Sequence, residues 1–158
     1  MYGSQPPSDD VLLELGRLTW AAICLEDVVE PVCWNLDSST TRDDRRPAGK
    51  RIDDALKALE AEGDSEGRAR AVGWLTEAKA ALEARHSVFH GIPGTFVPLG
   101  EGIQSGNLDP VLAHLPRGKY REQTNTPLTV EGLRSIRLRL EKAREGWDVI
   151  AVASRGGT

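Results

Sequence analysis

Arg85, His86 and His90 are the residues whose types and spacing could carry out chemistry. A guanidinium offers a planar set of donors to an anion, and an imidazole exchanges a proton close to neutral pH. All three lie near the end of a segment whose apolar residues recur at helical spacing. Their places on that helix therefore decide whether they can act together.

Arg85 is expected on the apolar side of this helix. At about 3.6 residues per turn, it falls near the middle of an apolar stripe that includes Leu82 and Phe89. A guanidinium there loses hydration unless it meets a carboxylate or lies in a polar cleft. Glu26 or Asp27 of the first predicted helix could be the partner. In the simplest interpretation, Arg85 only bridges two helices through such an ion pair.

The two histidines differ in their position around the helix relative to Arg85. His86 and His90 are one helical turn apart and share a face, whereas Arg85 and His90 diverge by roughly 140° on an ideal helix. They can meet if the helix loosens near His90, which Gly91 and Pro93 favour, or if their long side chains converge. Without that, they work at one site only across a dimer interface.

This region resembles the signature of the HEPN superfamily. The signature is an arginine, four intervening residues and a histidine near the end of a helix in an α-helical bundle. A polar residue usually follows the arginine, and glycine or a small residue often follows the histidine. The segment here reads Arg85-His86-Ser87-Val88-Phe89-His90-Gly91. Only this segment matches residue by residue, although the four-helix pattern of the chain is also similar to the family.

The resemblance implies an endoribonuclease that uses no metal ion or other cofactor, in which a 2′-hydroxyl of RNA attacks the adjacent phosphate. His90 would be the general acid or base, and Arg85 would hold the phosphate and stabilise the charge that develops there. His86 would orient His90 or contact the phosphate.

The resemblance also implies partners. Family members act as two-fold homodimers with both motifs facing one cleft, which would explain an arginine on an apolar side. RNA would be the substrate, and an antitoxin or a phage-defence protein would be a protein partner. Ile92 stands where toxins paired with nucleotidyltransferase antitoxins have a tyrosine, so silencing by modification of that tyrosine is not expected.

Two other functions use the same residues. A non-catalytic module that dimerises or binds a partner would use Arg85 and both histidines as polar groups of an interface, since fold alone does not fix function. A zinc site is the second alternative, because His86 and His90 could share an ion with a further ligand. The side chains that could supply that ligand are His114, Cys24, Cys33 and Glu83.

Four amphipathic segments are expected to be the helices that position these residues. Their expected ranges are about 9–36 behind the cap Ser8, about 48–61 before Gly63, from Ser65 to Gly91, and from the cap Thr129 to Ser154. Pro31 falls inside the first helix and can kink it. The four tryptophans are expected to fill core or interface volume rather than stack on bases. They are Trp20, Trp34, Trp74 and Trp147.

The expected fold is all-α, because four apolar stripes bury one another most simply in an antiparallel four-helix bundle. Residues 1–158 are expected to form a single domain, with flexible tails at 1–10 and 155–158. Between the third and fourth helices the periodicity disappears, which favours a short irregular or β-hairpin insertion. The candidate strands are Val111–Leu115 and Tyr120–Thr124.

Composition sets the remaining expectations. Hydrophobic residues make up 39% and charged residues 28%, as in an ordinary globular protein. The net charge of -4 gives no overall attraction for nucleic acid, so RNA would contact local basic stretches at 42–51, 117–121 and 134–144. Cys24 and Cys33 lie too far apart on one helix for a disulfide. With no signal peptide or membrane span expected, the protein is predicted to be soluble and cytoplasmic.

Overall fold

The computed structural model is a bundle of four helices with three short strands. It describes residues 8–37, 46–61, 65–90, 92–94, 111–114, 124–127 and 129–155. The helices are α1 (Asp9–Leu36), α2 (Ala48–Glu60), α3 (Glu66–His90) and α4 (Val130–Arg155). The strands are β1 (Ile92–Gly94), β2 (Val111–His114) and β3 (Thr124–Pro127). The predicted helical bundle is therefore present, and none of the helices in the described ranges is long and apolar enough to cross a bilayer.

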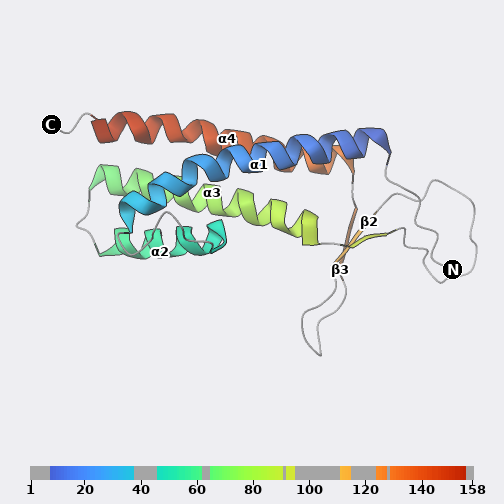
Figure 1. Ribbon diagram of the computed structural model, residues 1–158, viewed down its shortest axis with the longest axis horizontal. Coiled ribbons are helices and arrows are strands. Elements are labelled where there is room, and N and C mark those ends of the chain that lie inside the picture. The colour runs from blue at the N-terminus through green and yellow to red at the C-terminus, as the bar shows by residue number, and fades with distance from the viewer. Residues whose placement is uncertain are drawn as a thin grey trace, which may run out of the picture.

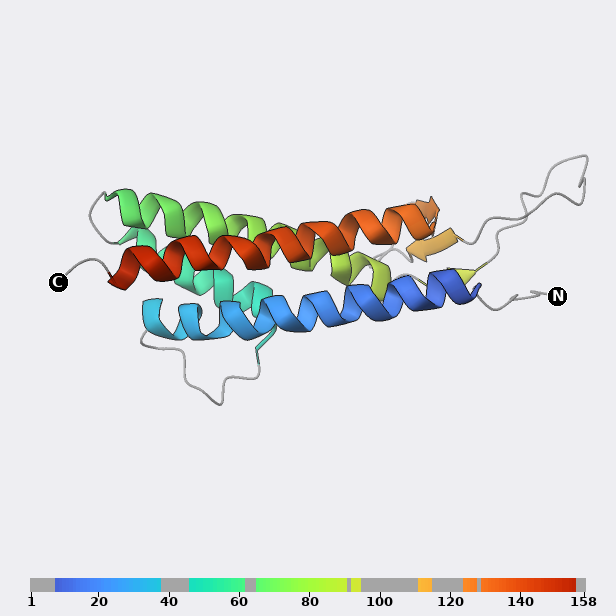
Figure 2. The same ribbon diagram turned by 90° about the horizontal axis from the view of Figure 1, so that it is seen from above.

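The helices do not all alternate in direction. Figures 1 and 2 show α1, α2 and α4 running one way and α3 running the other. Glu14 and Arg137, each near the start of its helix, pair α1 with α4 in parallel. An ion pair from Arg51 to Glu30 places the start of α2 beside the last third of α1. The predicted antiparallel order thus applies to α3 against its neighbours. It does not apply to α1 with α2, because α2 begins beside Glu30 and runs in the same direction as α1. The direction reverses at α3 and again at α4, so α4 is also parallel to α1.

Side-chain caps define where three helices begin. The hydroxyl of Ser8 accepts a hydrogen bond from the amide of Val11 at 3.4 Å. The hydroxyl of Thr129 accepts a hydrogen bond from the amide of Gly132 at 3.0 Å, and the hydroxyl of Ser65 accepts one from the amide of Arg68 at 3.2 Å. Each cap satisfies an amide that has no partner inside its own helix. The predicted caps Ser8 and Thr129 are confirmed, and the third helix opens at Ser65 as predicted, whereas Gly63 lies outside the described residues.

The core follows the predicted stripes with one large exception. Its largest fully buried side chains include Leu18, Leu25, Ile52, Leu75, Leu133 and Leu140. Trp74 joins α3 to α4, because its indole donates a 2.7 Å hydrogen bond to the carbonyl of Ala143 and its ring lies 5.5 Å from that of Trp147. Trp20, by contrast, is 67% exposed, so of the two predicted roles, core or interface, it does not have the core role.

The strands lie between α3 and α4 in sequence. They form an antiparallel sheet in the order β1-β2-β3, in which Ile92 faces Ala113 and Leu112 faces Thr126. β2 overlaps the candidate strand Val111–Leu115. The candidate strand Tyr120–Thr124 lies outside the described residues except for Thr124, where β3 begins.

Glu14 is the only charged side chain that is buried among the described residues, with 2% of its surface exposed. One of its oxygens accepts a 2.5 Å hydrogen bond from Nε of Arg137, and Arg17 lies 3.6 Å from the other. Arg137 also binds both oxygens of Glu141, at 2.7 and 2.9 Å. The bond from Arg137 lowers the pKa of Glu14 against the opposing effect of burial, with further lowering by the charges of Arg137, Arg134 and Arg17.

We expect Glu14→Gln to lower the free energy of unfolding by about 1–3 kcal/mol at pH 7, the usual range for a buried charged hydrogen bond. Because the pKa of Glu14 is lowered on folding, its contribution is present above the ordinary carboxyl pKa and is lost as the pH falls through the folded-state value. The difference between wild type and variant should therefore shrink in acid. Denaturant unfolding at pH 7 and in acid measures this, with the exposed Glu77→Gln as control. A difference that is constant with pH would contradict the assignment.

Candidate functional site

Arg85 lies on the buried side of α3, one turn before that helix ends. Its side chain is 30% exposed, and one terminal nitrogen lies 3.9 Å from a carboxylate oxygen of Glu26 on α1. Ala81 and Val88, on the same face of α3, are buried. The predicted position of Arg85 and an ion pair to one of the two predicted partners are thus confirmed, and Asp27 is exposed.

Phe89 covers the arginine rather than extending the core. It is 45% exposed, so the prediction of a buried Phe89 is wrong, and Val88 takes the core position at this end of α3. The guanidinium carbon of Arg85 lies 5.0 Å from the centre of the Phe89 ring. This is the distance of a cation–π contact, which favours a cation over the ring face. Phe89 therefore holds the guanidinium in place.

Arg85 keeps hydrogen-bonding capacity that its neighbours do not use. Its Nε is buried, and no atom of the described residues accepts a hydrogen bond from it. The pair with Glu26 is long, at 3.9 Å, and both side chains are partly exposed, so it contributes little to stability. A guanidinium with an unpartnered Nε and a long ion pair has donors left for an anion, because five N–H groups are available.

The two histidines lie differently. His86 is exposed on α3 and takes part in an interaction of its own. His90 is the last residue of α3, and its side chain lies outside the described residues. The backbone stays α-helical through His90, so the loosening that was predicted there is absent. On a regular helix, positions 85 and 90 are about 140° apart around the axis.

The metal-site alternative finds no cluster to support it in the described ranges. There, no three histidine, cysteine or acidic side chains come together in a way that could hold an ion. Cys24 and Cys33 are free, as predicted, and burial raises the pKa of Cys33 to about 11. A metal binds the thiolate, which is therefore costly to form at Cys33.

The local basic stretches are partly neutralised. Arg46 pairs with Asp54 at 2.6 Å, Arg51 pairs with Glu30, and Arg137 pairs with Glu14 and Glu141. The stretch at 117–121 lies outside the described residues. Any phosphate contact on the described surface would therefore depend on arginines that are less fully paired, of which Arg85 is one.

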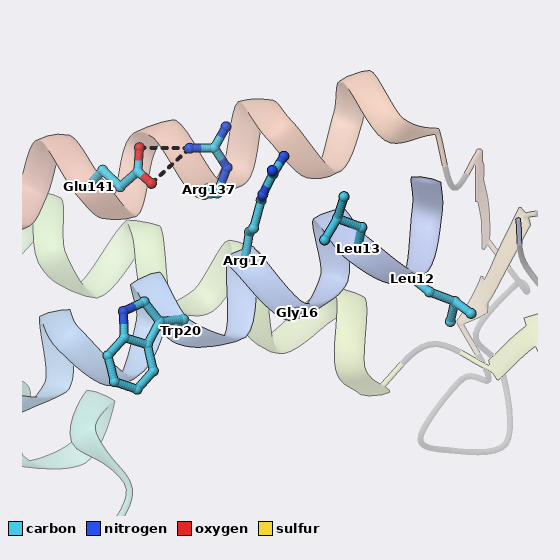
Figure 3. Close-up of a pocket in the computed structure, with 7 residues that line it drawn as sticks. All are labelled: Leu12, Leu13, Gly16, Arg17, Trp20, Arg137 and Glu141. Carbon is cyan, nitrogen blue, oxygen red and sulfur yellow. Dashed lines mark hydrogen bonds and ion pairs between the residues drawn. The ribbon is translucent and has the colours of Figure 1, made fainter. Parts of the chain in front are cut away.

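A surface groove between α1 and α4 was not predicted. Figure 3 shows the residues that line it: Leu12, Leu13, Gly16, Arg17, Trp20, Arg137 and Glu141. Leu13 and Arg17 point toward α4, whereas Trp20 projects away from it. The signal in the sequence was a second apolar stripe on α1, because Leu12, Leu13, Trp20 and Ile23 fall off the stripe that forms the core. Assigning a single apolar stripe to each helix leaves these four residues out.

Comparison of the chain with protein-family models, curated proteins and solved structures gives no match. The resemblance to the HEPN superfamily therefore depends on the segment from Arg85 to Gly91 and on the four-helix pattern, with no matching protein to add to it.

If Arg85 serves mainly as a helix staple, removing its partner should destabilise the bundle; we expect otherwise. Glu26→Gln should change the free energy of unfolding by less than about 1 kcal/mol, because a partly exposed pair at long distance is screened by solvent. Denaturant unfolding of wild type and variant measures this. Glu30→Gln is the matched variant for comparison and should lower the free energy of unfolding more, since Glu30 lies on the same helix and pairs with the more deeply buried Arg51. A loss of several kcal/mol in Glu26→Gln alone would identify the pair as a staple.

Proposed function

We propose that this protein is a metal-independent endoribonuclease of the HEPN type. Arg85 binds the phosphate and stabilises the charge that develops on it. His90 transfers the proton between the 2′-hydroxyl, the leaving oxygen and solvent. His86, exposed one turn before His90, has the secondary role of orienting His90 or contacting the phosphate. RNA is the substrate, and no cofactor is needed.

The observation that carries this proposal is the state of Arg85. It combines partial burial, a buried Nε without a partner in the described residues, a long ion pair and a ring that fixes its position. A partly buried guanidinium binds an oxyanion more strongly than one in open solvent. When RNA enters, a phosphate oxygen displaces Glu26, and the carboxylate keeps the empty site neutral until then.

The geometry of α3 favours a site shared by two chains. On a regular helix, Arg85 and His90 diverge, so one copy presents them to different directions. Across a two-fold axis, Arg85 of one protomer can face His90 of the other, and each interface then holds two equivalent sets. The proposed enzyme is accordingly a homodimer. An antitoxin or phage-defence partner would act by covering this cleft.

A non-catalytic binding module is the second candidate, and the pair between Arg85 and Glu26 is the observation in its favour. In that case the ion pair is complete in itself, and the exposed apolar residues of α1 serve only to hold a partner. The two candidates differ in whether Arg85 and His90 are needed for any chemistry on RNA.

Incubation of purified protein with RNA in the presence of a chelator tests the proposal. We expect cleavage products that end in a cyclic phosphate, because the attacking 2′-hydroxyl stays on the fragment that carries the phosphate. Arg85→Ala and His90→Ala should each lower the cleavage rate by at least about 100-fold, the usual scale for loss of an oxyanion donor or a general acid–base group. His86→Ala should lower it less.

Arg70→Ala is the matched control, because Arg70 also lies on α3 but pairs at its exposed start with Glu66, at 3.2 Å. It should keep the wild-type rate. Cleavage that survives unchanged in both Arg85→Ala and His90→Ala would exclude the proposal, as would activity that is lost with the chelator. Absence of cleavage in wild type, across single-stranded and structured RNA, would leave the binding module.

A further inference from the structure

One face of α1 is apolar and exposed. Its residues, the α1 stripe, are Leu12, Leu13, Gly16, Trp20 and Ile23. At about 100° per residue, all five fall within roughly 100° of the helix circumference. Their large side chains are between 41% and 67% exposed, which leaves about 400 Å² of apolar surface if a whole large apolar side chain has roughly 150–250 Å². A patch of this size on a single chain often marks a functional surface.

Two aspartates close the α1 stripe at its ends. Asp9 and Asp27 are 18 residues apart, which is five full turns, so both lie on the line that runs along the middle of the stripe. Both are exposed, and about 27 Å of helix separates them. Within the described residues, neither carboxylate has an ion pair or a hydrogen bond. Both negative charges are therefore available to a molecule that covers the stripe.

One arginine lies beside the centre of the stripe, on its α4 side. Arg17 is within one residue of the midpoint between Asp9 and Asp27. Its side chain is 57% exposed, and its 3.6 Å contact with Glu14 is longer than a hydrogen bond, so its donors stay available. Figure 3 shows it pointing toward α4 at the groove, which has a volume of about 620 Å³. The face thus presents an apolar centre, a base at its middle edge and an acid at each end.

This charge pattern argues against the two simplest occupants of the stripe. A second copy that laid its own stripe on this one in antiparallel would bring Asp9 level with Asp27, and a parallel copy would bring each aspartate level with its equivalent. Like charges then meet at both ends. Lipid is disfavoured for a similar reason, because a helix that binds an anionic membrane surface carries bases beside its apolar face. The pattern instead favours a different molecule with a base at each end.

We propose that the α1 stripe binds an amphipathic helix of another protein. This helix is about five turns long, with an apolar face toward Trp20, a lysine or arginine at each end and an acidic residue near its middle. A straight helix fits because the stripe runs in a line about 27 Å long, and helices bind such surfaces through residues at i, i+3, i+4 and i+7. The proposal depends on the stripe and its charges, and it goes beyond the proposed cleavage of RNA.

A synthetic helical peptide tests the proposal on the full chain. The basic peptide has about 22 residues, with leucines at helical spacing on one face, a glutamate at the middle edge and a lysine at each end, five turns apart. We expect a dissociation constant below about 100 µM, measured by fluorescence anisotropy of the labelled peptide. An acidic peptide, in which glutamate replaces both lysines, should bind at least about 10-fold more weakly, because like charges then meet at Asp9 and Asp27.

Exchange of charges on the protein tests the same contacts. The double variant Asp9→Lys with Asp27→Lys should bind the acidic peptide at least about 10-fold more tightly than the basic one. Trp20→Glu should weaken binding of the basic peptide at least about 30-fold, because it places a charge at the centre of the contact. Thr76→Glu, which adds the same charge to the exposed side of α3, should bind as wild type does. Circular dichroism shows that each variant folds, and if one does not, the other decides.

The proposal is overturned if neither peptide binds at about 1 mM, or if wild type binds both equally. It is also overturned if wild type sediments at twice the 17.2 kDa of one copy and Trp20→Glu does not, because a second copy then covers the stripe. Binding of phosphatidylglycerol vesicles by wild type but not by Trp20→Glu would overturn it in favour of lipid. Failure of RNA cleavage would leave the peptide affinities unchanged, so the helix site and the ribonuclease can fail separately.

Discussion

The buried carboxylate of Glu14 is the constraint around which the bundle is arranged. A charge that is almost fully removed from water is tolerable only if its oxygens are paired, and Arg137 of α4 is placed to do this. This fixes α4 against the start of α1, in parallel and in register. Glu141 then satisfies the other side of the guanidinium, so the network is complete within the two helices. This pair favours the register in which Arg137 meets Glu14.

That register has a consequence for the outer face of α1. Once α4 is held at Glu14, and α2 and α3 cover the remaining inward positions, the apolar side chains of Leu12, Trp20 and Ile23 on α1 stay between 41% and 67% exposed among the described residues. Arg17 contributes to both sides of this arrangement, because it supports the charge of Glu14 and borders Trp20. The burial of Glu14 and the exposure of Trp20 therefore have the same cause, which is the face of α1 that packs against α4.

The sequence predicts what short-range physics decides. The caps Ser8, Ser65 and Thr129 satisfy amides three residues away, and the core stripes follow from helical spacing. The partner of Arg85 could be narrowed to two residues because a buried guanidinium needs a carboxylate. The exposure of Trp20 could not be predicted, since a tryptophan at helical spacing has the same pattern whether its face is inward or outward. The direction of α2 depends on a long-range contact, Arg51 with Glu30, that no local pattern encodes.

Arg85 is where stability and function diverge. A long, partly exposed ion pair contributes little, while a buried Nε without a partner in the described residues costs free energy. For stability alone, an apolar side chain of similar volume would serve as well or better, because such replacements of partly buried ion pairs are often neutral or stabilising. Phe89, which could have joined the core, instead lies over the guanidinium. In the proposed function, a ligand with negative charge would offset this cost. The RNA phosphate of the proposed function has that charge.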